Sequence, residues 1–124
     1  MIIDEINISP LLKAFKKFEE FRDHLNTEQE RAGSIQAFEY CYELTWKTMK
    51  RLLEKRGHIT NSPRETFRIA AMERFIDNPE IWFDFLKMRS ITVHTYEEKE
   101  AEKVISIFQF FSSEMKSFIK NIGV

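Results

Sequence analysis

The sequence has little of what builds sheets of short strands or disulfide-bonded secreted domains. Its 124 residues include three glycines, three prolines and one cysteine. Few glycines and prolines argue against many tight turns, while abundant Glu, Lys, Leu, Ile and Phe favour long helices. The single cysteine, Cys41, excludes an intrachain disulfide. It falls on the apolar side of a predicted helix, where we expect a small core residue in a reducing compartment.

The chain also lacks an excess of charge of either sign. It carries 19 basic and 20 acidic residues, for a formal net charge of −1. The basic surplus usual in nonspecific nucleic-acid binders is absent, so any contact with RNA must be local. No apolar run approaches the ~20 residues of a membrane span, and the first residues do not have the pattern of a signal peptide. We therefore expect a cytoplasmic protein with no membrane segment.

Apolar residues at helical spacing fill most of the chain and predict an all-α fold. We expect a single domain over residues 1–124, formed as an up-and-down bundle of about five helices with no sheet. Capping sequences and proline mark most of the helix starts. The predicted helices cover roughly residues 10–25, 27–57, 62–75, 77–90 and 95–119.

Some apolar positions exceed what a small bundle readily buries. Residues 81–88 are apolar around much of the helix circumference, Ile107 widens the apolar stripe of the last helix, and Phe110 points almost opposite Phe108. Phe110 is therefore a candidate exposed aromatic residue. Surplus apolar surface of this kind predicts self-association, most simply as a homodimer.

The most informative stretch is Arg-Ser-Ile-Thr-Val-His-Thr-Tyr, which runs from Arg89 to Tyr96. The planar fork of an arginine suits a phosphate, and a histidine exchanges protons near neutral pH. In phosphodiester cleavage, His94 would take a proton from a 2′-hydroxyl or give one to the leaving oxygen while Arg89 holds the phosphate, without a metal. The alternative is a surface ion pair at Arg89, a histidine near a helix start and a tyrosine at the edge of the core.

This chemistry needs a break in the helix. Residues five apart on one α-helix lie about 140° apart around its axis, so Arg89 and His94 would not converge. The β-branched residues 91–93 weaken a helix, and Thr95 begins a capping box, so we predict a break between about 90 and 95. With Thr95 as N-cap, His94 would lie at the mouth of the last helix, where free N–H groups favour a phosphate and first-turn acids oppose it.

A second cluster lies at the border of the apolar stripe of the long helix. Glu39, Glu43 and Trp46 are close together there, and the two carboxylates are candidates for orienting Arg89 from a neighbouring helix. The alternative, which we favour, is that Glu43 pairs with Lys47 four residues on and that Trp46 belongs to the core.

Other kinds of site find little support. The remaining histidines, His24 and His58, lack ligand-like spacing to Cys, Asp or Glu, so we predict no metal site and no cofactor. The chain has no glycine-rich phosphate loop, no nucleophile elbow and no paired aspartates of the nucleotidyltransferase type. It is not expected to transfer nucleotides by itself.

Two stretches resemble a known family. They are residues 36–47, Gln-Ala-Phe-Glu-Tyr-Cys-Tyr-Glu-Leu-Thr-Trp-Lys, and residues 82–96, which end in the Arg89 to Tyr96 segment. Together they are similar to the HEPN superfamily, in the branch called HepT or nucleotidyltransferase substrate-binding protein. The motif of Arg, four to six residues, His, any residue and Tyr is loose alone, but it is fairly specific when joined to the first stretch.

This resemblance implies a helical bundle that dimerises and brings the Arg and His of both copies into one cleft that cuts RNA. It also implies a partner, a minimal nucleotidyltransferase that acts as antitoxin and can attach AMP to the motif tyrosine. Arg89, His94 and Tyr96 match these positions, whereas Ser90 stands where the branch often has Asn. The implied function is a toxin ribonuclease; the alternative is a noncatalytic subunit that docks the nucleotidyltransferase.

Overall fold

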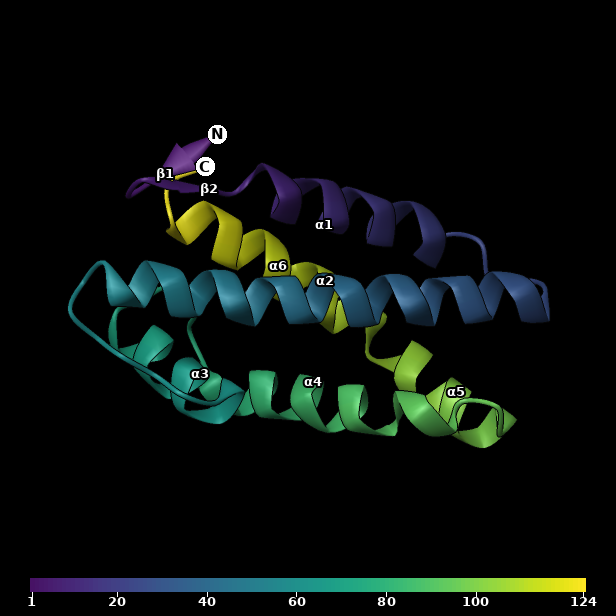
Figure 1. Ribbon diagram of the computed structural model, residues 1–124. Helices are drawn as coiled ribbons and strands as arrows, with labels where there is room; N and C mark the ends of the chain where they lie inside the picture. Colours follow the sequence, from purple (N-terminus) through teal and green to yellow (C-terminus); the bar gives the residue numbers. More distant parts are fainter.

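The computed structural model describes all 124 residues and is almost wholly helical (Figure 1). A short 3₁₀ turn, η1, follows α4 at Thr92–His94. The α-helices are α1 (Ser9–Arg22), α2 (Glu28–Glu54), α3 (Pro63–Met72), α4 (Pro79–Ile91), α5 (Glu98–Ser106) and α6 (Phe108–Asn121). The prediction of an all-α fold is confirmed.

The predicted last helix is divided in two at Ile107. Its N–H bonds to the carbonyl of Val104, and the residue both ends α5 and precedes α6. The buried residues continue at helical spacing through the break: Ala101 and Val104 on α5, then Phe108, Phe111, Ser112, Met115 and Phe118 on α6. Because the apolar spacing is uninterrupted, periodicity alone could not reveal the break.

A small sheet precedes α1 and was not predicted. Its strands, β1 (Ile2–Ile3) and β2 (Ile6–Asn7), pair antiparallel around a turn in which Asp4 and Glu5 have positive φ angles of 49° and 70°. Two-residue strands are too short to show the alternation by which a strand is recognised in a sequence. The absence of any sheet was therefore a wrong prediction, although the fold class is unchanged.

Helix α2 is the centre of the molecule. Figure 1 shows it between α1 and α4, and it contacts α1, α3, α4 and α5. Its N-terminus carries the predicted capping box, in which Thr27 accepts from the N–H of Glu30 and the Glu30 carboxylate accepts from the N–H of Thr27. None of the helices combines the length and apolarity needed to cross a bilayer.

Aromatic rings hold α1, α2, α4 and α6 together. The ring of Phe111 on α6 meets those of Phe18, Phe38 and Phe85 nearly edge to face, with centroids 5.2, 4.9 and 5.2 Å away. Trp82 lies 5.1 Å from Phe85 on α4. We call these five rings the aromatic core; edge-to-face pairs add about 0.5–1.5 kcal/mol each beyond burial. The aromatic core fixes where α4 lies and therefore where its C-terminal end points.

Cys41 and Phe110 lie as predicted. Cys41 is fully buried, and burial raises the pKa of its thiol to about 12. Such a thiol is inert at neutral pH. Phe110 leaves 63% of its surface exposed, as its position opposite the buried Phe108 indicated.

Candidate functional site

Helix α4 ends within the Arg89 to Tyr96 segment, as predicted. After Ile91 the chain makes the 3₁₀ turn η1, so the break between about 90 and 95 is confirmed. The predicted cap of the last helix is wrong. Thr95 donates its hydroxyl to the carbonyl of Thr92 at 2.9 Å, and α5 begins only at Glu98, with Glu97 at the N-cap and no side-chain cap. A threonine hydroxyl bonded to a nearby carbonyl is no longer oriented for capping.

His94 therefore does not lie at a helix mouth. It is the last residue of η1, and Tyr96 follows it in the exposed connection before α5. The two rings lie with centroids 6.2 Å apart and planes at 72°, and Tyr96 is 80% exposed. The contribution of free helix N–H groups to phosphate binding at His94 is lost, but the imidazole and the phenol remain open to a ligand.

Arg89 is fixed by a residue of its own segment. Its Nη1 donates to the Thr92 hydroxyl at 2.9 Å, and that hydroxyl donates to the carbonyl of Arg89 at 2.8 Å. Thr92 is buried, so this two-way contact holds the guanidinium against the start of η1. From the sequence, Thr92 was expected only to weaken the helix as one of the β-branched residues 91–93. A threonine three residues after an arginine at a helix end is the signal that could have identified this role.

Two carboxylates of α2 also contact Arg89. Glu39 Oε2 lies 3.5 Å from Nη1 of Arg89, and Glu43 Oε1 lies 3.3 Å from Nε, the latter without hydrogen-bond geometry. Trp46 donates its indole N–H to the other oxygen of Glu43 at 3.1 Å. The ion pair that we favoured between Glu43 and Lys47 does not form, because Glu43 is engaged by Trp46 and Arg89. The geometry is that of the other hypothesis, in which both acids orient Arg89.

The phenol of Tyr42 lies in the same environment. Burial is the main cause of a raised pKa at this hydroxyl, the charge of Glu43 raises it further, and the charge of Arg89 opposes the shift. The hydroxyl is buried and has no hydrogen-bond partner. Tyr42 therefore stays neutral beside the ion pair.

Ser90 does not join this cluster. Its hydroxyl donates to the carbonyl of Lys87 at 2.6 Å, which turns the side chain back onto α4. The structure thus brings Arg89 to Glu39 and Glu43, and His94 to Tyr96. Thr92 links the two groups, since it contacts Arg89 and begins the turn that ends at His94.

Tyr96 also borders a hollow of about 420 Å³ between α2 and the start of α5. We call it the Tyr96 hollow. Its wall is formed by Glu28, Arg31, Ala32 and Ile35 of α2 together with Thr95, Tyr96, Glu98 and Ala101. Acidic and basic side chains both line it, so it has no strong preference for an anion.

The other two histidines lie in the connections that follow α1 and α2. His24 is exposed, and His58 Nε2 lies 2.9 Å from a carboxylate oxygen of Glu73. No group of three His, Cys, Asp or Glu side chains is placed to hold a metal ion. Activity without a metal or cofactor stays a prediction.

Comparisons with known proteins bear on the whole chain. Residues 6–123 match the family described as "Nucleotidyltransferase substrate binding protein like". A curated relative from Haemophilus influenzae, "Probable ribonuclease HepT", is 27% identical over 139 residues, covering 98% of this chain and 95% of the relative.

Solved structures show the same fold. A protein from Thermus thermophilus superposes with a TM-score of 0.85 at 26% identity, covering 92% of this chain and 99% of that one. The Haemophilus influenzae protein HI0074, described as revealing the fold of a substrate binding domain of a nucleotidyltransferase, superposes with a TM-score of 0.83 at 27% identity, covering 94% and 98%. The resemblance inferred from the two motifs is confirmed: the chain belongs to the HepT-like family of nucleotidyltransferase substrate-binding proteins.

Proposed function

We propose that this protein is a HepT-like toxin ribonuclease that cleaves RNA without a metal through Arg89 and His94. The observation that carries the proposal is that one short segment holds both a guanidinium fixed by Thr92, Glu39 and Glu43 and an exposed imidazole at the end of the next turn. A positioned cation and a proton-exchanging group are the two elements that metal-independent phosphodiester cleavage requires. The name of the curated relative supports the same activity.

The reaction is an internal displacement at phosphorus. Arg89 binds a non-bridging oxygen of the scissile phosphate through its planar fork, and His94 accepts the proton of the neighbouring 2′-hydroxyl. The 2′-oxygen forms a bond to phosphorus while the bond to the 5′-oxygen breaks. That oxygen takes up a proton from a protonated imidazole, and the products are a 2′,3′-cyclic phosphate and a 5′-hydroxyl. Such acid–base catalysis contributes about 10²–10⁴-fold.

A homodimer completes the proposed site. The carboxylates of Glu39 and Glu43 share the Arg89 guanidinium, so one copy attracts a phosphate only weakly. Two copies facing each other would supply a second guanidinium and a second imidazole, one imidazole for each proton transfer. Exposed Phe110 offers apolar surface for association.

Tyr96 is the proposed point of control by a minimal nucleotidyltransferase antitoxin. The phenol oxygen attacks the α-phosphate of ATP, pyrophosphate leaves, and the phenol proton passes to solvent, so that AMP becomes attached to Tyr96. The 80% exposure of Tyr96 leaves the phenol open to such an enzyme, and the 6.2 Å between its ring and that of His94 brings the new phosphate close to the imidazole. The modification would then compete with RNA for Arg89.

The ion pairs that Arg89 makes with Glu39 and Glu43 favour a second candidate function. In this second function the chain is a noncatalytic subunit that docks a nucleotidyltransferase and presents a substrate to it. The contacts of Arg89 with Glu39 and Glu43 would then serve only to join α4 to α2. The descriptions of the family and of HI0074 refer to this kind of binding.

Labelled RNA incubated with the purified protein in EDTA separates the two functions. The ribonuclease should cleave the RNA, and Arg89→Ala, Arg89→Lys and His94→Ala should each abolish cleavage while the helical circular dichroism spectrum is retained. Arg89→Lys should fail because an ammonium cannot reproduce the two-pronged contact with phosphate. Intact RNA with the unmodified wild type, or normal cleavage by both alanine variants, would rule out the ribonuclease and favour the noncatalytic subunit.

Intact mass spectrometry tests whether modification of Tyr96 controls the activity. After incubation with the cognate nucleotidyltransferase and ATP, the wild type should gain the mass of AMP and lose cleavage activity. Tyr96→Phe keeps the ring without the acceptor oxygen, so it should cut RNA, gain no AMP and stay active. AMP on both proteins, or on neither, would mean that another residue or docking alone exerts control.

A further inference from the structure

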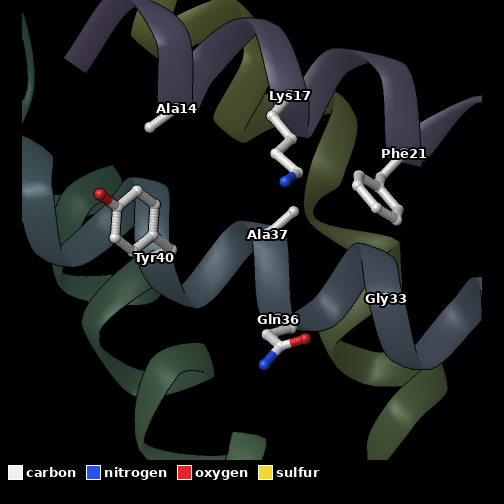
Figure 2. Close-up of a pocket in the computed structure, with 7 residues that line it drawn as sticks. All are labelled: Ala14, Lys17, Phe21, Gly33, Gln36, Ala37 and Tyr40. Atoms are coloured by element: carbon white, nitrogen blue, oxygen red, sulfur yellow. The ribbon is translucent and has the colours of Figure 1, made fainter. Parts of the chain in front are cut away.

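A long groove lies between α1 and α2, away from Arg89 and His94. Its main part has a volume of about 520 Å³ and is lined by Ala14, Lys17, Phe21, Gly33, Gln36, Ala37 and Tyr40 (Figure 2). A second part of about 380 Å³ shares Ala14, Lys17 and Tyr40 and adds Lys13 and residues near the start of α1. We call the two parts together the α1–α2 groove.

Small residues open this groove. Ala14, Gly33 and Ala37 line it where the two helices face each other, and Figure 2 shows the ring of Phe21 beside Gly33. A Cβ atom at Gly33 would lie 2.8 Å from the Phe21 ring, so the ring can take this position only because residue 33 is glycine. Tyr40 borders both parts of the groove and is 63% exposed.

The charge of the groove is of one sign. Lys17 extends from α1 toward α2 in Figure 2, and Lys13 lies one turn before it on the same helix. Neither lysine takes part in any of the ion pairs of the chain, and no acid lines either part of the groove. A chain with a net charge of −1 thus has a local excess of positive charge in this groove.

An open aromatic ring beside unpaired lysines suits a single-stranded nucleic acid. Bases stack on aromatic side chains at about 1–3 kcal/mol each, while cations follow the phosphates. The volume also falls within the range of roughly 300–1,000 Å³ typical of ligand sites. A purely apolar occupant would leave the positive charge of the two lysines unmatched, whereas phosphates match it.

The groove and the Tyr96 hollow border the same stretch of α2. Gln36 lines the α1–α2 groove, and Ala32, one turn earlier on α2, lines the Tyr96 hollow. Both residues are exposed and uncharged. An exposed, uncharged stretch of α2 therefore lies between the groove and the Tyr96 hollow.

We propose that the α1–α2 groove is a subsite for single-stranded RNA. An unpaired base stacks on Tyr40, Lys13 and Lys17 hold the adjoining phosphates, and the strand passes over α2 at Gln36 toward His94. The choice of RNA as the ligand rests on the proposed function, whereas the aromatic and cationic character of the groove does not.

Binding of a short fluorescent oligouridine tests this subsite. All variants carry His94→Ala, so that RNA stays intact, and affinity is measured by anisotropy. Lys13→Glu with Lys17→Glu should weaken binding by about tenfold or more, and Tyr40→Ala by about tenfold, the loss of one stacked base, whereas Tyr40→Phe should bind normally. The matched control is Lys116→Glu with Lys120→Glu on α6, two lysines with the same spacing and the same change in charge. It should change affinity by less than about twofold.

Several results would contradict the subsite. Equal weakening by the two double variants would mean diffuse attraction by charge alone, and normal binding by Tyr40→Ala would remove the stacking. AMP that binds as tightly as the oligouridine would make the groove a mononucleotide pocket, and equal affinity for a duplex would exclude an unpaired base. Melting temperatures of all variants should match the parent, since neither Tyr40 nor any of the changed lysines is buried.

Cleavage by proteins with His94 intact separates this inference from the proposed function. The groove variants should raise KM and leave kcat unchanged. Cleavage with an unchanged KM in those variants would overturn the subsite alone. Binding that depends on the groove in a protein that never cuts RNA would overturn the ribonuclease alone, and failure of the parent protein to bind RNA would overturn both.

Discussion

The aromatic core and the segment of residues 89–97 have opposite properties, although α4 belongs to both. Each ring of the aromatic core is at most 1% exposed, and its contacts join four helices. In the segment, His94 and Tyr96 are exposed, and the contacts of Arg89 and Thr95 are polar. Arg89 contacts Thr92 and two acids, and the hydroxyl of Thr95 donates to a carbonyl. The core therefore determines where the segment lies, while the segment carries the proposed chemistry and contributes less to stability.

The largest effect is expected in the aromatic core. Phe111→Ala removes a ring that touches Phe18, Phe38 and Phe85, and it should lower the free energy of unfolding by about 3–5 kcal/mol. Urea denaturation followed by circular dichroism measures this change. A loss below about 1 kcal/mol would show that the helices are not held together by these rings and would remove the comparison.

A smaller effect on stability is expected at the link between the two regions. Thr92→Val deletes the hydroxyl that accepts from Arg89 and donates to its carbonyl, and it should destabilise the protein by about 1–2 kcal/mol. Under the proposed function, kcat for RNA cleavage should fall because the guanidinium is no longer fixed. Thr95→Val is the matched control, since it also removes a hydroxyl bonded to a carbonyl but does not touch Arg89. Equal losses of kcat in both variants would show that Thr92 has no specific role in positioning Arg89.

At the exposed end of the segment, stability and activity should separate. His94→Ala should change the free energy of unfolding by no more than about 0.5 kcal/mol, because the side chain is exposed and makes no hydrogen bond with the rest of the chain. Denaturation curves of wild type and variant should overlay while cleavage is lost. A strongly destabilised variant would place His94 among the structural residues.

The smallest effect is expected at Glu114, a carboxylate beside the buried face of α6. Burial raises its pKa above the usual value, and the charge of Asp77 adds to the shift. The folded protein therefore holds this proton more tightly than the unfolded chain, so stability falls as pH rises through the interval between the two pKa values. Glu114→Gln should stabilise the protein at pH 7 by less than about 0.5 kcal/mol. The difference in melting temperature between Glu114→Gln and wild type should vanish in acid, where Glu114 is protonated in both states. A variant less stable than wild type at pH 7 would contradict the raised pKa of Glu114.

The sequence predicted the fold better than the contacts of the site. Apolar periodicity identified the helices and the positions of Cys41 and Phe110, because burial on one helix face repeats along the chain. It missed the division at Ile107, which leaves that period intact. The four-residue spacing of Glu43 and Lys47 also favoured a local ion pair. The competing partner, Arg89, comes from another helix and is placed only by tertiary packing.

The segment around His94 shows the same limit at short range. Thr95 and the acids after it have the composition of a capping box, yet the threonine hydroxyl bonds backward to η1 and the helix starts later. Capping the next helix and bonding to the Thr92 carbonyl are two competing uses of the Thr95 hydroxyl, and composition does not show which one forms. The roles of Arg89, His94, Ser90 and Tyr96 in function stay predictions.

Helix α2 sets a fixed distance between the groove residues and Arg89. It runs for 27 residues without interruption, roughly 40 Å at 1.5 Å per residue. Neighbouring residues point about 100° apart around a helix, so Tyr40 faces α1 while Glu39 reaches Arg89 on the other side. The spacing from the stacked base to the scissile phosphate would thus be set by α2 and by the contacts of Glu39 and Glu43 with Arg89 across it. Cleavage in the proposed complex would therefore fall at a constant number of nucleotides from the base that Tyr40 holds.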